Sequence, residues 1–253
     1  MVRKTHEALV GNQFGSVAAA YVMSPVHARG PDLEQLVEIV SGRGEAHAID
    51  LGCGGGHVSF NVAPHVREIV AYDLSTDMLQ VVTEVAAERG LTNIATKSGA
   101  AEHLPFDDAT FDLVLTRFSA HHWRDIQTAL REARRVMKPG GRAVFIDAVA
   151  PPSPLADTHP QAIELLRDPS HVRNYSVEEW RRFLRQAGFT PGGVTLRRLP
   201  LEFAAWIARM RTPEAHVPAI RSLQANAPEE VARHFDIKRD GSFTLDTMTL
   251  VAS

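Results

Sequence analysis

Residues 48–60, AIDLGCGGGHVSF, limit the possible folds of this chain more than any other segment. A short apolar run leads into four glycines within residues 52–56, and a helix-forming pattern follows. Glycine reaches positive φ and has no Cβ, so the backbone can approach a ligand closely at such positions. The segment therefore predicts a strand, a glycine-rich loop and a helix, the arrangement with which α/β folds bind a nucleotide-like cofactor.

Helix and strand periodicities alternate along the chain around this segment, which predicts βαβ units and a parallel sheet. Strands with their exit loops are expected at residues 46–52, 68–73, 93–102, 111–118 and 142–149. Helices are expected at residues 31–40, 57–63, 77–90, 125–141 and 178–189. Two further segments, 192–203 and 242–253, are expected to form antiparallel strands with helices between them.

The composition is that of an ordinary globular chain, with 44% hydrophobic residues, 23% charged residues and a net charge of -3. This charge provides no broad attraction to nucleic acid or to an anionic membrane, so neither is expected as a partner. The single cysteine, Cys53, excludes an internal disulfide framework and fits a reducing compartment. No apolar run approaches the roughly 20 residues that span a bilayer, and we expect a cytoplasmic protein without a signal peptide.

The glycine spacing distinguishes between two classes of cofactor. The dinucleotide pattern G-x-G-x-x-G fails, because the sixth position counted from Gly52 is His57. The spacing D-x-G-x-G-x-G fits instead, with Asp50, Gly52, Gly54 and Gly56. A carboxylate repels a pyrophosphate but suits an ammonium or sulfonium group, which favours S-adenosylmethionine. The alternative is that the glycines only form a tight turn.

A second acid, Asp73, ends the next expected strand about twenty residues after the first glycine. An acid at this place accepts hydrogen bonds from both ribose hydroxyls of an adenosine cofactor. Asp73 could instead cap the following helix, but Ser75 is the better N-cap. Asp73 therefore indicates an adenosine ligand without choosing between nicotinamide and adenosylmethionine cofactors.

Four segments resemble the motifs of the class I S-adenosylmethionine-dependent methyltransferases, in family order over residues 48–147: AIDLGCGGG, VAYDLSTDML, SGAAEHLPFDDATFDLVLTRFSAHHW and EARRVMKPGGRAVFID. The resemblance is closest to the small-molecule subgroup that includes the ubiquinone/menaquinone-type C-methyltransferases. It implies one α/β domain over residues 1–253, with a Rossmann-like, doubly wound, seven-stranded sheet whose last strand is antiparallel. Residues 1–30 would form a capping helix, 31–150 the cofactor-binding core, and 151–253 the substrate-side helices and final strands.

The resemblance also implies a cofactor site, formed by Tyr21, Asp50, Gly52, Cys53, Gly54, Asp73, Leu74, Met78, Ala100, Ala101, Glu102 and Arg117. In it, Asp50, Gly52 and Gly54 would surround the methionine portion, with Arg117 lining that end. Asp73 would hold the ribose hydroxyls.

The adenine end departs from the family pattern. Leu74 and Met78 would lie against the adenine, although a Met at this helical spacing could equally belong to the core. Many family members carry an Asp-Ala pair at the adenine edge, where this chain has Ala100 and Ala101. The backbone N–H of Ala101 and the nearby Glu102 are then the candidates for contacting the adenine.

Methyl transfer from a sulfonium is an in-line displacement that depends on alignment and desolvation, and it needs a base only if the acceptor loses a proton. The candidates for that base are His121 and His122, in the loop after the fourth strand. The alternative is that one of them packs against Trp123 or bonds to backbone. No metal site is expected, because two adjacent histidines lack a third ligand at a recognisable spacing. Tyr21 is either near the methionine end or an ordinary aromatic residue of an amphipathic helix.

The expected acceptor is a small molecule. Asp147, His171, Arg173 and Tyr175 follow the fifth strand, where this fold class commonly builds the acceptor wall. Two other classes remain open: a nicotinamide-dependent oxidoreductase, which His57 disfavours, and a non-catalytic protein that binds S-adenosylmethionine. The acceptor and the oligomeric state are not readable from the sequence.

Overall fold

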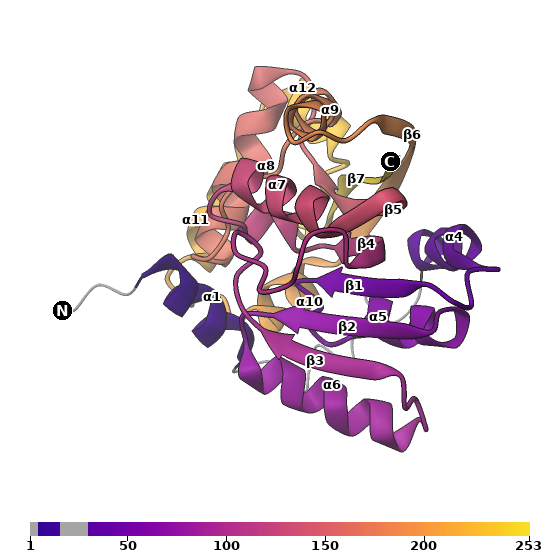
Figure 1. Ribbon diagram of the computed structural model, residues 1–253. Helices are drawn as coiled ribbons and strands as arrows, with labels where there is room; N and C mark the ends of the chain where they lie inside the picture. Colours follow the sequence, from indigo (N-terminus) through magenta and orange to yellow (C-terminus); the bar gives the residue numbers. More distant parts are fainter. Residues whose placement is uncertain (1–4, 16–29) are drawn as a thin grey trace.

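A computed structural model describes residues 5–15 and 30–253, and they form one seven-stranded sheet in the order β3-β2-β1-β4-β5-β7-β6 (Figure 1). The first five strands pair in parallel, while β7 is antiparallel to both of its neighbours. This topology confirms the predicted doubly wound α/β fold with an antiparallel last strand. The strands are β1 (His47–Leu51), β2 (Glu68–Asp73), β3 (Ile94–Ser98), β4 (Phe111–Arg117), β5 (Met137–Val149), β6 (Pro191–Leu201) and β7 (Phe243–Ala252).

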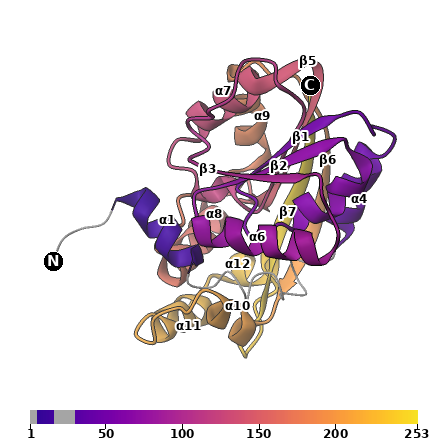
Figure 2. The same cartoon turned by 60° about the horizontal axis from the view of Figure 1, so that its bottom comes forward.

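Helices cover both faces of the sheet. The described helices are α1 (His6–Gly15), α4 (Pro31–Val40), α5 (His57–Val62), α6 (Thr76–Glu88), α7 (Ile126–Val136), α8 (Pro154–Arg167), α9 (Val177–Gln186), α10 (Phe203–Arg209), α11 (Val217–Ala225) and α12 (Glu229–His234). One buried cluster joins α7 and α9 to the strands, and two others join α4, α5 and α6 to the opposite face. A further cluster joins α8, α10, α11 and α12 at the ends of β5, β6 and β7 (Figure 2).

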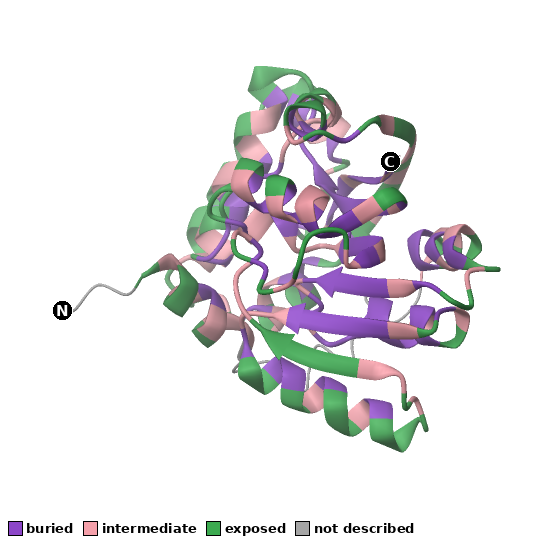
Figure 3. Ribbon diagram, in the orientation of Figure 1, coloured by how far each residue is buried: buried purple, intermediate pink, exposed green. Residues whose placement is uncertain are grey.

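The alternation of side chains along each strand explains this layering. In β1, Ile49 and Leu51 belong to the cluster with α7 and α9, whereas Ala48 belongs to the cluster with α4 and α5. Figure 3 shows β1 and β2 buried at the centre of the sheet and β3 exposed at its edge. The carboxyl ends of β1, β2 and β4 therefore meet at one protected edge of the sheet, where α/β folds bind ligands.

A capping box begins α9: the Ser176 side chain accepts from the Glu179 N–H, and the Glu179 side chain accepts from the Ser176 N–H. The predicted helix over residues 125–141 is too long. It ends at Val136, and β5 begins at Met137, which pairs with Phe111 of β4. Pro139 disfavours helix at the residue before it, so the chain can enter the sheet directly after the helix.

The N-terminal capping helix expected over residues 1–30 is described only in part. Helix α1 spans His6–Gly15, and Gly30 precedes α4. Residues 1–4 and 16–29, including Tyr21, lie outside the described residues. Within the described part of the chain, no helix combines the length and the apolar character needed to cross a membrane.

Candidate active site

The glycine-rich loop after β1 has a backbone that only glycine adopts readily. Gly52 and Gly54 have φ of 67° and 48°. The N–H groups of Gly52 and Cys53 both donate to the Tyr72 carbonyl, at 2.8 and 3.0 Å, which fixes the loop to the end of β2. A Cβ on Gly52 would come within 1.7 Å of the Ser119 Oγ, whereas a Cβ on Gly54 would meet no atom within 4 Å. The loop is thus held tightly on its Ser119 side and open at Gly54.

A cavity lies over this loop at the carboxyl ends of β1, β2 and β4. It encloses about 970 Å³, including the part open to solvent, and α1 contributes part of its wall. Nine of the residues expected at the cofactor site line it: Asp50, Gly52, Cys53, Gly54, Asp73, Leu74, Ala101, Glu102 and Arg117. We name this space the loop cavity.

The carboxylate of Asp50 is buried, and only one of its two oxygens has hydrogen-bond partners among the described residues. Its Oδ2 accepts from the Ser59 N–H at 3.1 Å and from the Ser59 Oγ at 2.7 Å. Its Oδ1 is buried without a hydrogen-bond partner among the described residues. Burial raises the pKa of Asp50 to about 7 against the opposing hydrogen bonds from Ser59. An unpaired buried oxygen in the wall of the loop cavity suits a cationic ligand, which would supply the missing partner.

Asp73 holds the glycine loop and the start of α6 together. Its Oδ2 accepts from the Gly54 N–H at 2.8 Å, and its Oδ1 accepts from the Ser75 N–H at 2.9 Å. Ser75, not Asp73, is the N-cap of α6, since the Ser75 Oγ accepts from the Met78 N–H at 3.3 Å. Each carboxylate oxygen can accept a second hydrogen bond, so Asp73 retains capacity for ligand hydroxyls. Burial raises the pKa of Asp73.

Two expected contacts with the adenine are not found in the wall of the loop cavity. Met78 is fully buried with Leu79 and Val82 on the side of α6 that faces the sheet. Its burial and helical spacing fit a core role, and the contact of Met78 with the adenine stays a prediction. The carbonyl of Ala100 accepts from the Tyr72 hydroxyl at 3.3 Å, and Ala100 does not line the cavity. Glu102 lines it, and its Oε1 accepts from the Asp125 N–H at 3.1 Å.

Arg117 lines the loop cavity and is paired with an acid that the sequence did not single out. Its Nε donates to the Asp32 Oδ2 at 2.5 Å, and both side chains are largely buried. Asp32 stands in the first turn of α4, where an acid is ordinary, and it lies 85 positions away in sequence. No local pattern could have connected the two residues.

A second cavity lies beside the first, between the ends of β4 to β7 and helices α8 and α10. It encloses about 600 Å³, including the part open to solvent, and we name it the side chamber. Its apolar lining includes Ala148, Leu199, Leu201, Trp206, Met210 and Leu245. Phe118 and His122 line both cavities, so the two spaces share a wall.

His121 lines the side chamber and is oriented by a carboxylate. Its Nδ1 bonds to the Asp147 Oδ1 at 2.5 Å, and its backbone N–H donates to the Asp147 Oδ2 at 3.2 Å. The Nε2 of His121 has no hydrogen-bond partner among the described residues. Burial lowers the pKa of His121, but the charge and hydrogen bond of Asp147 outweigh it and raise the pKa above its usual value. This arrangement aims a basic nitrogen away from Asp147.

His122 is oriented by backbone and not by a carboxylate bond. Its Nδ1 lies 3.1 Å from the Ser170 carbonyl, which agrees with the alternative of a backbone hydrogen bond. Burial, followed by the charge of His121, lowers the pKa of His122 to about 3. The neighbouring Trp123 donates from Nε1 to the Ser119 Oγ at 3.1 Å. His122 is therefore a neutral ring in the wall between the two cavities.

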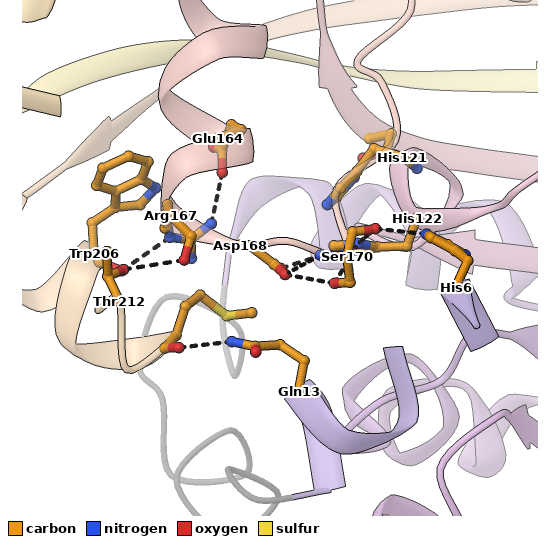
Figure 4. A network of polar contacts seen from close by, with 12 residues as sticks. His6, Gln13, His121, His122, Glu164, Arg167, Asp168, Ser170, Trp206 and Thr212 are labelled. Carbon is orange, nitrogen blue, oxygen red and sulfur yellow. Dashed lines mark hydrogen bonds and ion pairs between the residues drawn. The ribbon is translucent and has the colours of Figure 1, made fainter. Parts of the chain in front are cut away.

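Helix α1 is bound to the side chamber by hydrogen bonds that cross most of the chain (Figure 4). The Nε2 of His6 lies 3.0 Å from the Ser170 carbonyl, the same oxygen that His122 contacts. The Gln13 side chain donates to the Met210 carbonyl at 2.7 Å. The two contacts connect residues that are 164 and 197 positions apart in the sequence, so no local sequence pattern could indicate them.

The other residues expected at the acceptor wall divide into two groups. Asp147 is hydrogen-bonded to His121, and the ring centroid of His171 lies 5.7 Å from that of His121. Arg173 instead pairs with Asp157 at 2.7 Å, and Tyr175 packs edge-on against Phe183. Among the residues that the structure describes, no three His, Cys, Asp or Glu side chains are grouped to hold a metal ion.

Comparison with known proteins gives consistent matches. A family model described as "Methyltransferase domain" matches residues 49–145. The uncharacterized protein YafE of Escherichia coli is 47% identical over 201 residues, covering 79% of this chain and 97% of YafE. The uncharacterized methyltransferase YcgJ of Bacillus subtilis is 34% identical over 224 residues, covering 88% of each chain. The crystal structure of YcgJ superimposes with a TM-score of 0.84 at 31% identity, covering 87% of this chain and 97% of YcgJ.

Proposed function

The chain belongs to the class I S-adenosylmethionine-dependent methyltransferases, and from this premise we propose that it transfers a methyl group from S-adenosylmethionine to a small-molecule acceptor. The cofactor is proposed to lie in the loop cavity. When bound there, S-adenosylmethionine supplies an electrophilic methyl group on a sulfonium.

One observation carries the cofactor assignment: the buried Asp50 Oδ1 lacks a partner among the described residues at the wall of the loop cavity. A pyrophosphate beside this carboxylate would add repulsion, whereas the ammonium and sulfonium groups of S-adenosylmethionine supply positive charge. The open space at Gly54 admits a ligand against the backbone. These features support an adenosylmethionine site and disfavour a nicotinamide dinucleotide.

The remaining residues then take defined roles in the proposal. Asp73 accepts hydrogen bonds from the ribose hydroxyls while still holding the Gly54 N–H. Leu74, Ala101 and Glu102 form the adenine side of the loop cavity. Arg117, fixed by Asp32, lines the methionine end.

The chain contributes to methyl transfer mainly by alignment. The loop cavity positions the cofactor, and the adjoining side chamber positions the acceptor so that its nucleophilic atom lies in line with the methyl group. The apolar part of the side chamber wall reduces the solvation of the nucleophile. His121 accepts a proton where the acceptor must lose one, and His122 stays neutral beside the cationic cofactor.

Labelled methyl transfer tests this function. The protein is incubated with methyl-labelled S-adenosylmethionine and a deproteinised small-molecule extract, and separately with protein and with nucleic acid. We expect label in the small-molecule fraction only. Label confined to protein or nucleic acid contradicts the acceptor class, and cofactor binding without transfer to any fraction supports the non-catalytic alternative. We also propose a cytoplasmic location, which the buried thiol of Cys53 fits.

A further inference from the structure

We infer that a groove between α8, α11 and α12 is a second ligand site, which takes a small, neutral aliphatic molecule with one terminal hydroxyl group. The groove encloses about 810 Å³, including the part open to solvent, and we name it the helical groove. Its lining shares no residue with the lining of the loop cavity or of the side chamber. The inference therefore concerns a site apart from the one to which the proposed function belongs.

Helix α8 separates the helical groove from the side chamber. Its residues Leu155, His159 and Ala162 line the groove, and they recur at the spacing that places side chains on one face of a helix. Glu164 and Arg167 line the side chamber instead. The two cavities thus lie on different faces of the same helix.

The wall of the helical groove is aliphatic. Leu155 of α8 and Leu223 of α11 both line it, although they are 51% and 40% exposed. Ala162, Pro228 and Val231 continue this surface, and no Phe, Tyr or Trp among the described residues lines the groove. Apolar side chains gathered on one concave surface are typical of a binding site, unlike a leucine exposed singly. An aliphatic chain in the groove would remove this surface from water.

The helical groove has no charge to offer a ligand. Among the described residues that line it, none is Asp, Glu, Lys or Arg. Burial lowers the pKa of His159, so the one lining ring that could become charged is neutral at neutral pH. A carboxylate or an ammonium group would lose its hydration in the groove without gaining a counter-charge. These surroundings favour a neutral ligand.

His159 indicates the hydroxyl group. Its Nε2 is buried without a hydrogen-bond partner among the described residues. Two other polar side chains of the wall are used within their own helices: the Thr158 hydroxyl donates to the Pro154 carbonyl at 3.0 Å, and the Asn226 amide to the Ser222 carbonyl at 2.9 Å. Buried polar atoms are normally hydrogen-bonded. Because a hydroxyl both donates and accepts, it can bond to the His159 ring in either neutral tautomer.

The test uses 1-octanol as the probe, with octanoate and octylammonium as matched compounds that carry a charged end. Each is titrated by calorimetry into the full-length protein, with and without S-adenosylhomocysteine. We expect 1-octanol to bind in both conditions, at least about tenfold more tightly than either ion, because an ion would be desolvated without a partner. His159→Phe keeps a ring but removes both nitrogens, and it should lower the affinity for 1-octanol about 3- to 10-fold, the loss of one hydrogen bond.

Three results of these titrations would overturn the inference: no binding of 1-octanol up to its solubility limit, equal affinity for octanoate, or displacement of S-adenosylhomocysteine by 1-octanol. Since 1-octanol should bind without the cofactor product, a failure of S-adenosylhomocysteine to bind would affect only the proposed function.

A matched pair of variants tests the location. Leu223→Asp places a carboxylate in the wall of the groove and should weaken 1-octanol binding at least about tenfold, because the probe cannot solvate that charge. Leu196→Asp, at an exposed position of β6 outside the groove, should leave the affinity unchanged. Ala162→Trp fills the groove and should abolish binding. Normal binding in both Leu223→Asp and Ala162→Trp would place the probe elsewhere and overturn the inference.

Two other occupants of an apolar groove would give different results. The protein should not sediment with vesicles of neutral phosphatidylcholine, and analytical ultracentrifugation should show the same oligomeric state for the wild-type protein and for Ala162→Trp. Vesicle binding that Ala162→Trp abolishes would mean that a lipid surface covers the groove. A dimer that Ala162→Trp dissociates would mean that a second copy of the chain covers it. Either result would overturn the inference.

Discussion

His121 and His122 are adjacent in sequence, with ring centroids 4.2 Å apart, yet their surroundings shift their pKa values in opposite directions. The hydrogen bond and charge of Asp147 raise the pKa of His121 against the effect of burial. Burial, followed by the charge of His121, lowers the pKa of His122 to about 3. Surroundings that shift the pKa values of two titratable groups apart give the groups different chemical roles. His121 can exchange a proton near neutral pH, while His122 adds no positive charge beside the loop cavity.

The first prediction concerns these two rings directly. In a histidine-labelled sample followed by NMR, His121 should titrate at higher pH than a free histidine, and His122 should stay neutral down to about pH 4. The His121→Gln variant assigns the signals. Asp147→Asn should lower the pKa of His121, because it removes the carboxylate charge. Two rings that titrate together near pH 6.5 would contradict the separation.

Asp73 provides the second prediction. Asp73→Ala removes the proposed hydrogen bonds to the ribose, and hydrogen bonds to a charged group contribute about 1.5–3 kcal/mol. The affinity for S-adenosylhomocysteine, measured by calorimetry, should fall by at least about tenfold. Asp77→Ala is the control, because Asp77 is an exposed acid in the first turn of α6. Equal affinities in the two variants would refute the ribose assignment.

The third prediction separates backbone strain from ligand contact. Gly54 and Gly42 both have positive φ, and a Cβ on either would meet no atom within 4 Å. Alanine at each position should cost about 1–2 kcal/mol of stability, because both backbones are left-handed. Only Gly54→Ala should weaken cofactor binding, since its methyl group would enter the loop cavity. Chemical denaturation and calorimetry measure the two effects, and normal cofactor affinity in Gly54→Ala would speak against this placement.

The fourth prediction follows from the pKa of Asp50, which burial raises to about 7. Below that pH the carboxyl is mostly neutral, and above it the carboxylate can pair with a cation. Affinity for S-adenosylmethionine should therefore rise by about tenfold from pH 6 to pH 8, as the ionised fraction increases. Asp50→Asn should remove most of this dependence. A flat wild-type profile would show that Asp50 does not pair with the cofactor.

The fifth prediction concerns the buried pair of Arg117 and Asp32. Asp32→Ala leaves the Arg117 guanidinium without this carboxylate, and breaking a buried ion pair costs about 3–5 kcal/mol. Urea denaturation should show a loss near the lower end of that range, since Arg117 has further interactions. Glu34→Ala, on the same helix, is the comparison because Glu34 is exposed. Similar losses of unfolding free energy in both variants would mean that the Arg117–Asp32 pair contributes little to stability.

The fold was predictable because its signals are local. The central strands are short apolar runs, and Ser75 caps its helix as expected. The glycine spacing singled out Asp50 and the loop, and both line the loop cavity. At Met78 the same helical spacing fits either a core residue or a ligand contact, and the structure shows the residue fully buried.

The side chamber was not predictable from sequence. Its wall combines residues of β5, β6, β7, α8 and α10 with the loop after β4, and the packing of these elements is a tertiary property. The partners Asp32 and Arg117, or His6 and Ser170, are equally remote in sequence. For His121, the sequence supplied the residue and its position after β4, but only the fold supplied Asp147 as its orienting group.

Titration calorimetry with S-adenosylmethionine and with NAD distinguishes the two classes of cofactor, with Asp73→Ala measured alongside the wild-type protein. One S-adenosylmethionine should bind per chain, binding should be weaker in the variant, and NAD should not bind. Tight binding of NAD together with no binding of S-adenosylmethionine would contradict the proposed cofactor.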